Sequence, residues 1–118
     1  MTGLTVTARG IDSGALLELA GHLDHRTAPE VRAALADITL TAGQQLIIDL
    51  SDLTFCDSSG IATFVAARNR ALAADAAVAL AAVPARVTRV FRLVGLDQVM
   101  ATYPTAQAAA EDWTRTTH

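Results

Sequence analysis

Several features that are scarce or missing narrow the possibilities for this chain. It contains a single cysteine, so it cannot form an internal disulfide, and a reducing compartment is expected. It contains no lysine; all nine basic residues are arginine, without a basic run, and the isoelectric point is about 5.4. We therefore expect no direct binding to nucleic acid or to an anionic membrane surface.

Targeting and membrane-spanning segments are also missing from the sequence. The first residues, 1–7, alternate between apolar and polar side chains and lack the charged and apolar regions of a signal peptide. The most apolar stretch, 71–83, is interrupted by Asp75 and is too short to cross a bilayer. These absences predict a cytoplasmic protein.

The composition is that of a folded globular protein. Of the 118 residues, 52% are hydrophobic and 18% are charged, with nine basic and twelve acidic side chains and a net charge of −3. A chain of this length can bury its own core without disulfides or metals. We expect one domain that covers residues 1–118.

Hydrophobic periodicity predicts the order of the elements. Residues 4–8 alternate as a half-buried strand does, the turn 10–14 follows, and 15–20 forms the second strand of a hairpin. Further strands are expected at 46–50, 76–83 and 99–103, and helices beginning near residues 27, 58, 84 and 105. The order β-β-α-β-α-β-α-β-α predicts an α/β fold, with a mixed, mostly parallel sheet of four to five strands and helices packed on it.

Polar residues and apolar stripes define the expected helices. We expect Thr27 and Glu30 to form a capping box, Ser58 to be the N-cap of the second helix and Thr105 to cap the last helix. The expected buried positions of the second helix are Ile61, Phe64, Val65 and Leu72; those of the third are Val87, Val90, Phe91 and Val94.

The segment 49–60 collects polar side chains where a buried strand ends and a helix begins. In an open α/β sheet this is the usual place for function. The unpaired N–H groups of such a helix terminus tolerate a phosphate, and Gly60, without a Cβ, would let another surface approach closely. By residue type alone, however, Asp57, Ser58 and Ser59 are also explained as helix-capping residues.

Three parts of the sequence resemble the STAS-domain anti-sigma factor antagonists. The turn Asp57-Ser58-Ser59-Gly60 is similar to the Asp-Ser-Ser/Thr-Gly motif of that family. The segment 21–29 is similar to its Gly-x-Leu/Ile-Asp…Thr-Ala-Pro loop, and the segment 89–96 to its third helix and Gly-Leu exit. The resemblance covers nearly the whole chain in order and implies the STAS fold.

The resemblance also implies a partner-switching function. In that family the first serine of the motif, here Ser58, is phosphorylated by an anti-sigma factor that is also a serine kinase. The chain is then no enzyme and needs no cofactor. Its unphosphorylated form binds the kinase and releases a sigma factor, phosphorylation ends the binding, and a phosphatase restores it. The helix terminus is expected to absorb part of the added charge locally.

The expected partner-binding surface combines the motif with the outward side of the second helix. Its residues are Asp24, Asp57, Ser58, Ser59, Gly60, Ala62, Thr63, Ala66 and Arg70. For Asp24 two roles stay open: it forms an Asx-type turn, or it shapes the partner surface or helps to orient the serine hydroxyl.

Cys56 is expected to be a small buried side chain. His22 and His25 lack the further ligands that a metal site needs, so no metal is expected.

Two alternatives remain. A STAS module of another assembly, such as a stressosome-like scaffold or the soluble subunit of a lipid transporter, would share the fold. A small hydrolase or nucleotide-binding protein could use Ser58 or the helix terminus. The sequence contains neither Gly-x-Ser-x-Gly nor a Gly-Lys-Ser/Thr phosphate loop, and it offers no histidine base in a recognisable arrangement.

Overall fold

A computed structural model of the chain describes residues 3–116. The strands are β1 (Leu4–Ile11), β2 (Gly14–Leu23), β3 (Gln45–Cys56), β4 (Ala77–Ala81) and β5 (Ala101–Tyr103). The helices are α1 (Ala28–Asp37), α2 (Ser58–Ala73), α3 (Ala85–Leu93), the short 3-10 helix η1 (Leu96–Gln98) and α4 (Ala106–Thr116).

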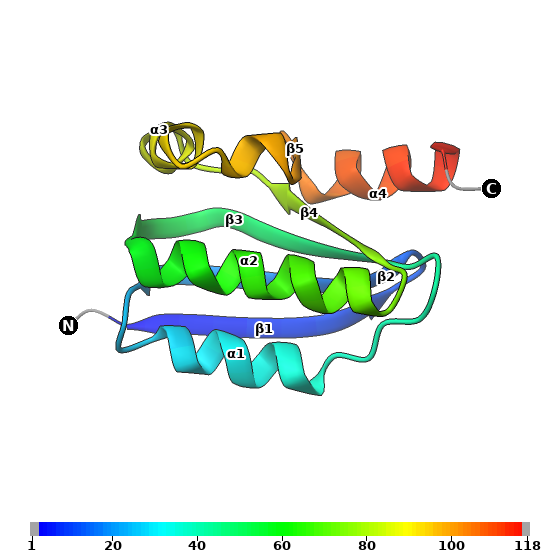
Figure 1. Cartoon of the computed structure of the whole chain (residues 1–118), viewed down its shortest axis with the longest axis horizontal. Helices are drawn as coiled ribbons and strands as arrows, with labels where there is room; N and C mark the ends of the chain where they lie inside the picture. Colours follow the sequence, from blue (N-terminus) through cyan, green and yellow to red (C-terminus); the bar gives the residue numbers. More distant parts are fainter. Residues whose placement is uncertain (1–2, 117–118) are drawn as a thin grey trace.

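The strands form one sheet in the order β1-β2-β3-β4-β5 (Figure 1). Strand β1 is antiparallel to β2, and every other neighbouring pair is parallel. The predicted element order and the mixed, mostly parallel sheet are confirmed, with the addition of η1. Because β2 and β3 are parallel, their carboxyl ends lie side by side. The polar segment 49–60 passes through this edge of the sheet on its way from β3 into α2.

The sheet has a hydrophobic core on each face. On one face, Leu17 of β2 and Ile48 of β3 pack with side chains of α1, α2 and α3. On the other face, Leu16 and Ile47 pack against Ala109 of α4. Neighbouring residues of one strand therefore belong to different cores, as the alternation of side chains in a strand requires. Both central strands are buried on both faces.

Strand β3 continues six residues beyond the predicted end at Leu50 and reaches Cys56. Its pairing with β2 shifts register twice, between Glu18 and Ala20 and between Gly21 and His22. These irregularities interrupt the period-two burial pattern, so periodicity predicted only residues 46–50 as a strand. Gly21 lies at the second shift with a φ of 111°, where a Cβ would approach the Gly3 carbonyl oxygen to 2.3 Å. A side chain at this position would strain the backbone.

Several apolar side chains expected in the core are exposed instead. On α2, Phe64 is buried, but Val65 and Leu72 are exposed. On α3, Val87 and Phe91 are buried, but Val90 and Val94, the residue after the helix, are exposed. The predicted stripes were too wide because α2 and α3 each press only a narrow side against the sheet, and neither covers the other's flank.

Candidate functional site

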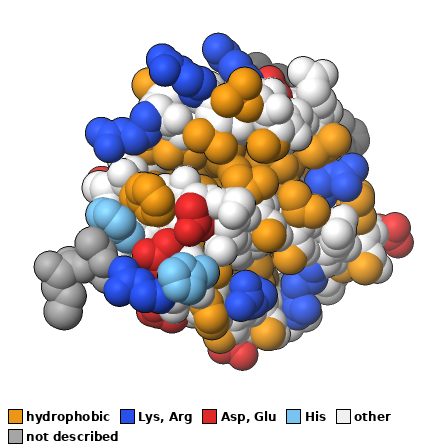
Figure 2. Space-filling model, turned by 60° about the vertical axis from the view of Figure 1, so that its left-hand side comes forward, with side chains coloured by type: hydrophobic (Ala, Val, Ile, Leu, Met, Phe, Trp, Pro, Cys, Tyr) orange, Lys and Arg blue, Asp and Glu red, His pale blue; other side chains and the backbone are white. Residues whose placement is uncertain are grey.

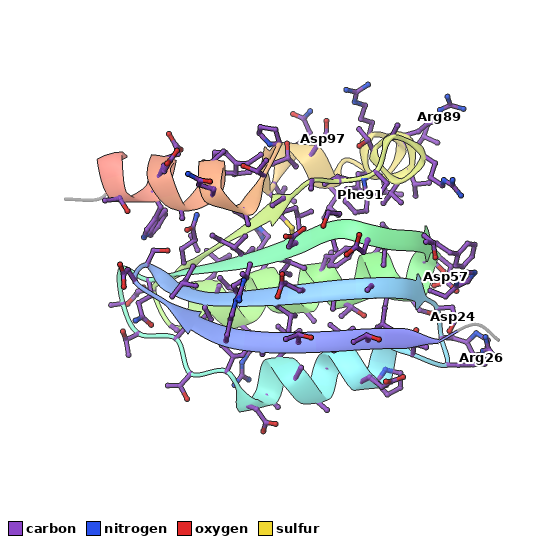
Figure 3. The ribbon with its side chains drawn as sticks, turned by 180° about the vertical axis from the view of Figure 1, so that it is seen from behind. Asp24, Arg26, Asp57, Arg89, Phe91 and Asp97 are labelled. Atoms are coloured by element: carbon purple, nitrogen blue, oxygen red, sulfur yellow. The ribbon has the colours of Figure 1, made fainter. Side chains whose placement is uncertain are left out.

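The candidate site lies at the carboxyl ends of β2 and β3, where α1 and α2 begin. Leu23 pairs with Cys56 at the end of the ladder, and the Asp57 N–H donates to the Leu23 carbonyl oxygen at 3.2 Å. This bond brings the two loops together. Figure 3 shows Asp24, Arg26 and Asp57 at this same end of the molecule.

Asp57, and not Ser58 as predicted, is the N-cap of α2. Its Oδ1 accepts hydrogen bonds from the N–H groups of Ser59 at 2.8 Å and Gly60 at 3.3 Å. A carboxylate binds these donors more strongly than a hydroxyl does. Ser58 is therefore the first residue of the helix, and its side chain is exposed. The cap makes the serine hydroxyl accessible to a partner.

Gly60 is buried and faces the protein interior, contrary to its predicted role in partner contact. A Cβ at this position would lie 2.5 Å from Cys56 Sγ and 2.9 Å from Leu23 Cγ. The glycine is needed because α2 starts directly on top of these two side chains. Ser59 is half-buried, and its carbonyl oxygen accepts a hydrogen bond from Thr63 Oγ1 at 2.8 Å.

Asp24 organises the turn that leads into α1. Its Oδ1 accepts from the Arg26 N–H at 2.9 Å and from the Thr27 N–H at 3.2 Å, and its Oδ2 pairs with the Arg26 guanidinium at 3.3 Å. Burial acts to raise the pKa of the Asp24 carboxyl, but these hydrogen bonds and the Arg26 charge together hold the pKa below its ordinary value. Of the two roles left open, the geometry is that of the Asx-type turn.

Thr27 does not form the predicted capping box. Its hydroxyl donates to the His22 carbonyl oxygen at 2.8 Å and accepts from the Asp24 N–H at 2.9 Å. Thr27 is buried, so these bonds satisfy polar groups that water cannot reach. The Asp24 and Thr27 side chains thus fix the conformation of the loop between β2 and α1. This loop lies next to the residue that precedes Ser58, because Asp57 is hydrogen-bonded to Leu23.

Cys56 is partly buried below Ser58. Burial, together with the negative charge of Asp57, raises the pKa of the Cys56 thiol to about 12. The thiol is therefore protonated at neutral pH and a poor nucleophile. The side chain is thus unreactive, but it is only partly buried and not fully buried as predicted.

An aromatic pair beside the site was missed by the sequence analysis. The rings of His22 and Phe55 stack with centroids 5.3 Å apart, and Thr54 Oγ1 lies 3.2 Å from His22 Nδ1. Phe55 is 43% exposed although it is a large apolar side chain. A phenylalanine within the mostly polar residues 51–59 was the only signal for it. An exposed aromatic ring close to Ser58 gives a partner an apolar contact.

The expected docking residues of α2 differ in exposure and in their position along the helix. Ala62 and Ala66 are exposed, as predicted. Thr63 is 1% exposed, so its predicted outward position is wrong. Arg70 is exposed and donates to the carbonyl oxygens of Ala36 and Ile38 at the end of α1. It lies about 18 Å along the helix from Ser58, so it is not part of the group around the serine.

The described part of the chain contains no group of three or more side chains that could hold a metal ion. None of its helices is long and apolar enough to span a bilayer.

Comparison with known proteins identifies the family. The STAS domain family model matches residues 5–109. The chain is 32% identical over 82 residues to the anti-sigma-B factor antagonists of Listeria monocytogenes and Listeria innocua, an alignment that covers 70% of this chain and 72% of each relative.

Solved structures show the same fold. An anti-sigma factor antagonist from Mycobacterium paratuberculosis has a TM-score of 0.78 at 26% identity over 95% of both chains. The antagonist SpoIIAA in its unphosphorylated form has a TM-score of 0.70 at 18% identity, over 95% of this chain and 99% of that one. Part of the murine anion transporter Slc26a9 has the same fold, with a TM-score of 0.76 at 13% identity over 98% of this chain and 23% of the transporter. At this identity the likeness concerns the fold and not the function. The chain therefore belongs to the STAS domain family and, within it, to the SpoIIAA-like anti-sigma factor antagonists.

Proposed function

We propose that this chain binds an anti-sigma factor with serine kinase activity, and that phosphorylation of Ser58 by that kinase ends the binding. The observation that carries the proposal is the exposed Ser58 side chain at the first position of α2, directly after the capping carboxylate of Asp57. Antagonists of this family are not enzymes, so the chain acts by binding. It works in the cytoplasm, and a phosphatase that removes the phosphate from Ser58 resets it.

The Asp57 cap determines how a phosphate would be received. In a helix with a free N-terminus, the unpaired N–H groups would neutralise part of the charge. Here the N–H groups of Ser59 and Gly60 already donate to Asp57 Oδ1. A phosphate on Ser58 therefore adds about −1.5 to −2 charges beside a carboxylate that occupies those donors. The added charge faces the solvent and the partner.

This arrangement favours a switch in binding over a change in fold. The loop between β2 and α1 is held by the hydrogen bonds and the ion pair that Asp24 makes with Arg26 and Thr27. None of these interactions involves Ser58. A partner shaped to the neutral hydroxyl would meet added bulk, desolvation and repulsion from Asp57. A loss of about 3–4 kcal/mol of binding free energy lowers the affinity by roughly two to three orders of magnitude.

Phosphorylation mapping and binding to purified candidate anti-sigma kinases test the proposal. With ATP, mass spectrometry should place one phosphate on Ser58. In calorimetry without ATP, Ser58→Ala should bind the kinase as the wild type does, and Ser58→Asp should bind more weakly by about tenfold or more. Thr41→Asp is the matched control, since Thr41 is exposed near the opposite end of β3. Equal affinity of the two Ser58 variants, or a phosphate on another residue, contradicts the switch.

A further inference from the structure

The exposed large hydrophobic side chains of the described residues are not scattered. Apart from Phe55, they lie on α2, on α3 and its C-terminal end, and after η1: Val65, Leu72, Val90, Leu93, Val94 and Val99. Leu93 is 82% exposed and Val94 57%. We call these six side chains the apolar face. Large exposed apolar clusters on soluble domains mark interaction sites.

One part of the apolar face is the side of α2 that is turned toward η1. Val65, Arg68 and Leu72 are three and four residues apart and therefore lie along one side of the helix. The Arg68 Nε donates to the Val99 carbonyl oxygen at 3.1 Å, which fixes that side toward the end of η1. The opposite side of α2 carries Arg70, which is bonded to the end of α1.

The other part is the side of α3 that is turned toward α2. Phe91 points from α3 into the core (Figure 3). Its ring meets that of Phe64 edge-on, with the ring centroids 5.6 Å apart. Thr88 and Arg92 border a hollow shared with Tyr103 on one side of this buried line. Val90 and Val94, one turn apart, lie on its other side. In Figure 2, hydrophobic side chains form a broad band on this part of the surface, with basic side chains along its edges.

The charge around the apolar face has one sign. Five of the nine arginines are in α2 and α3, and neither helix contains an acidic residue, although the whole chain has a net charge of −3. Arg70 lies on the opposite side of α2 and Arg92 borders the hollow, so the arginines left to border the apolar face are Arg68, Arg86 and Arg89. Asp97 of η1 borders the hollow with Arg92 and Tyr103, on the far side of α3. Arg89 extends away from the body of the protein (Figure 3). An apolar centre with basic edges is complementary to an apolar stripe with acidic edges.

The spacing of the apolar face fits a helix. Val65 and Leu72 are two turns apart, about 10 Å along α2, which is the spacing of the i and i+7 anchors of an incoming amphipathic helix. The same side of α2 begins at Ile61, less than one turn after Ser58. One partner can therefore contact the serine and the apolar face together.

We propose that the apolar face binds an amphipathic helix with acidic flanks, belonging to the same anti-sigma kinase that recognises Ser58. The identity of the partner rests on the function proposed above; the chemistry of the bound helix rests on the apolar face and its arginines. Ser58 then controls one end of the interface, and the apolar face supplies affinity that phosphorylation does not touch directly.

Two pairs of variants test this against the purified kinase by calorimetry. Leu93→Glu should weaken binding by about tenfold or more, and Arg89→Glu by about fivefold at low salt, an effect that shrinks in 0.5 M salt because of screening. Ala33→Glu and Arg32→Glu are the matched controls, because both residues are exposed on α1. Hydrogen exchange in the complex should slow at the apolar face. Thermal unfolding verifies that each variant is folded.

The outcomes separate this inference from the switch. If Ser58→Asp loses binding while Leu93→Glu and Arg89→Glu keep it, the apolar face is not the interface and the switch stands. If the two face variants lose binding while Ser58→Ala and Ser58→Asp bind equally, the switch fails and the apolar face stands. If Arg89→Glu binds as tightly as the wild type, the acidic character of the helix is wrong. Co-sedimentation with phosphatidylglycerol vesicles, abolished by Leu93→Glu, would overturn the proposal in favour of a lipid surface.

Discussion

The two sides of α2 differ in how completely they are covered. On the closed side, Thr63 is buried with its hydroxyl bonded to the Ser59 carbonyl oxygen, and Arg70 reaches the end of α1. On the open side, Val65 and Leu72 are exposed, and the Arg68 side chain makes the link to the end of η1. Both sides belong to one helix with one serine at its start.

This difference in coverage distinguishes the side of α2 that stabilises the fold from the side that is available to bind a partner. Polar residues are satisfied within the protein on the closed side, whereas apolar residues are left exposed on the open side. Burial of apolar area stabilises by about 25 cal/mol per Å², so leaving such area exposed gives up stability that a partner can recover on binding. Substitutions on the closed side should therefore affect folding, and those on the open side should spare it.

The largest expected effect on the free energy of unfolding comes from the contact between α2 and α3. Phe91→Ala should lower the free energy of unfolding by about 3–5 kcal/mol, because the Phe91 ring is buried against Phe64. Leu93→Ala, two residues away and exposed, should change it by less than about 0.5 kcal/mol. Urea unfolding measures both. Similar losses from the two variants would show that the apolar face is covered in solution.

An intermediate effect is expected beneath Ser58. Gly60→Ala should lower the free energy of unfolding by about 1–3 kcal/mol, since the new Cβ meets Cys56 Sγ and Leu23. Combining it with Cys56→Ala should cost less than the sum of the single variants, with a coupling of about 1 kcal/mol. Additive single effects in urea unfolding would mean that the helix start can shift away from the strand.

The smallest effect compares the two sides directly with nearly isosteric changes. Thr63→Val should lower the free energy of unfolding by about 1 kcal/mol, because it removes the hydrogen bond from the buried hydroxyl to Ser59. Val65→Thr, on the open side, should stay within about 0.5 kcal/mol. Chemical denaturation of the pair measures the difference, and a reversed order would contradict the assignment of the two sides.

Part of the site was predictable from local sequence. Asp57, Ser58 and Ser59 belong to a motif that announces a helix start, and the helix begins at Ser58. Which residue caps it was not predictable, because Asp and Ser are both good caps and the backbone conformation chooses between them. The predicted capping role of Thr27 was wrong for the same reason. Its hydroxyl donates to the His22 carbonyl oxygen, a partner that only the folded loop brings near.

Burial was predicted less well than element order. Periodicity identified the apolar residues of α2 and α3 but placed Val65 inward and Thr63 outward, the reverse of what is found. Periodicity ranks positions around a helix, but the width of the buried side depends on the neighbouring elements. The Phe55–His22 stack was also not predicted, because a register shift just before this pair decides that the two residues lie opposite each other in β2 and β3.

The sequence by itself determined the order of strands and helices, the type of sheet and the position of the serine turn, since these follow from local periodicity and turn chemistry. The tertiary structure alone decided that Asp57 takes the helix donors, that Gly60 faces the core, and that an apolar face bordered by arginines is left open between α2 and α3. The physical reason is that capping, close approach and exposure depend on contacts between segments distant in sequence, which local patterns do not encode.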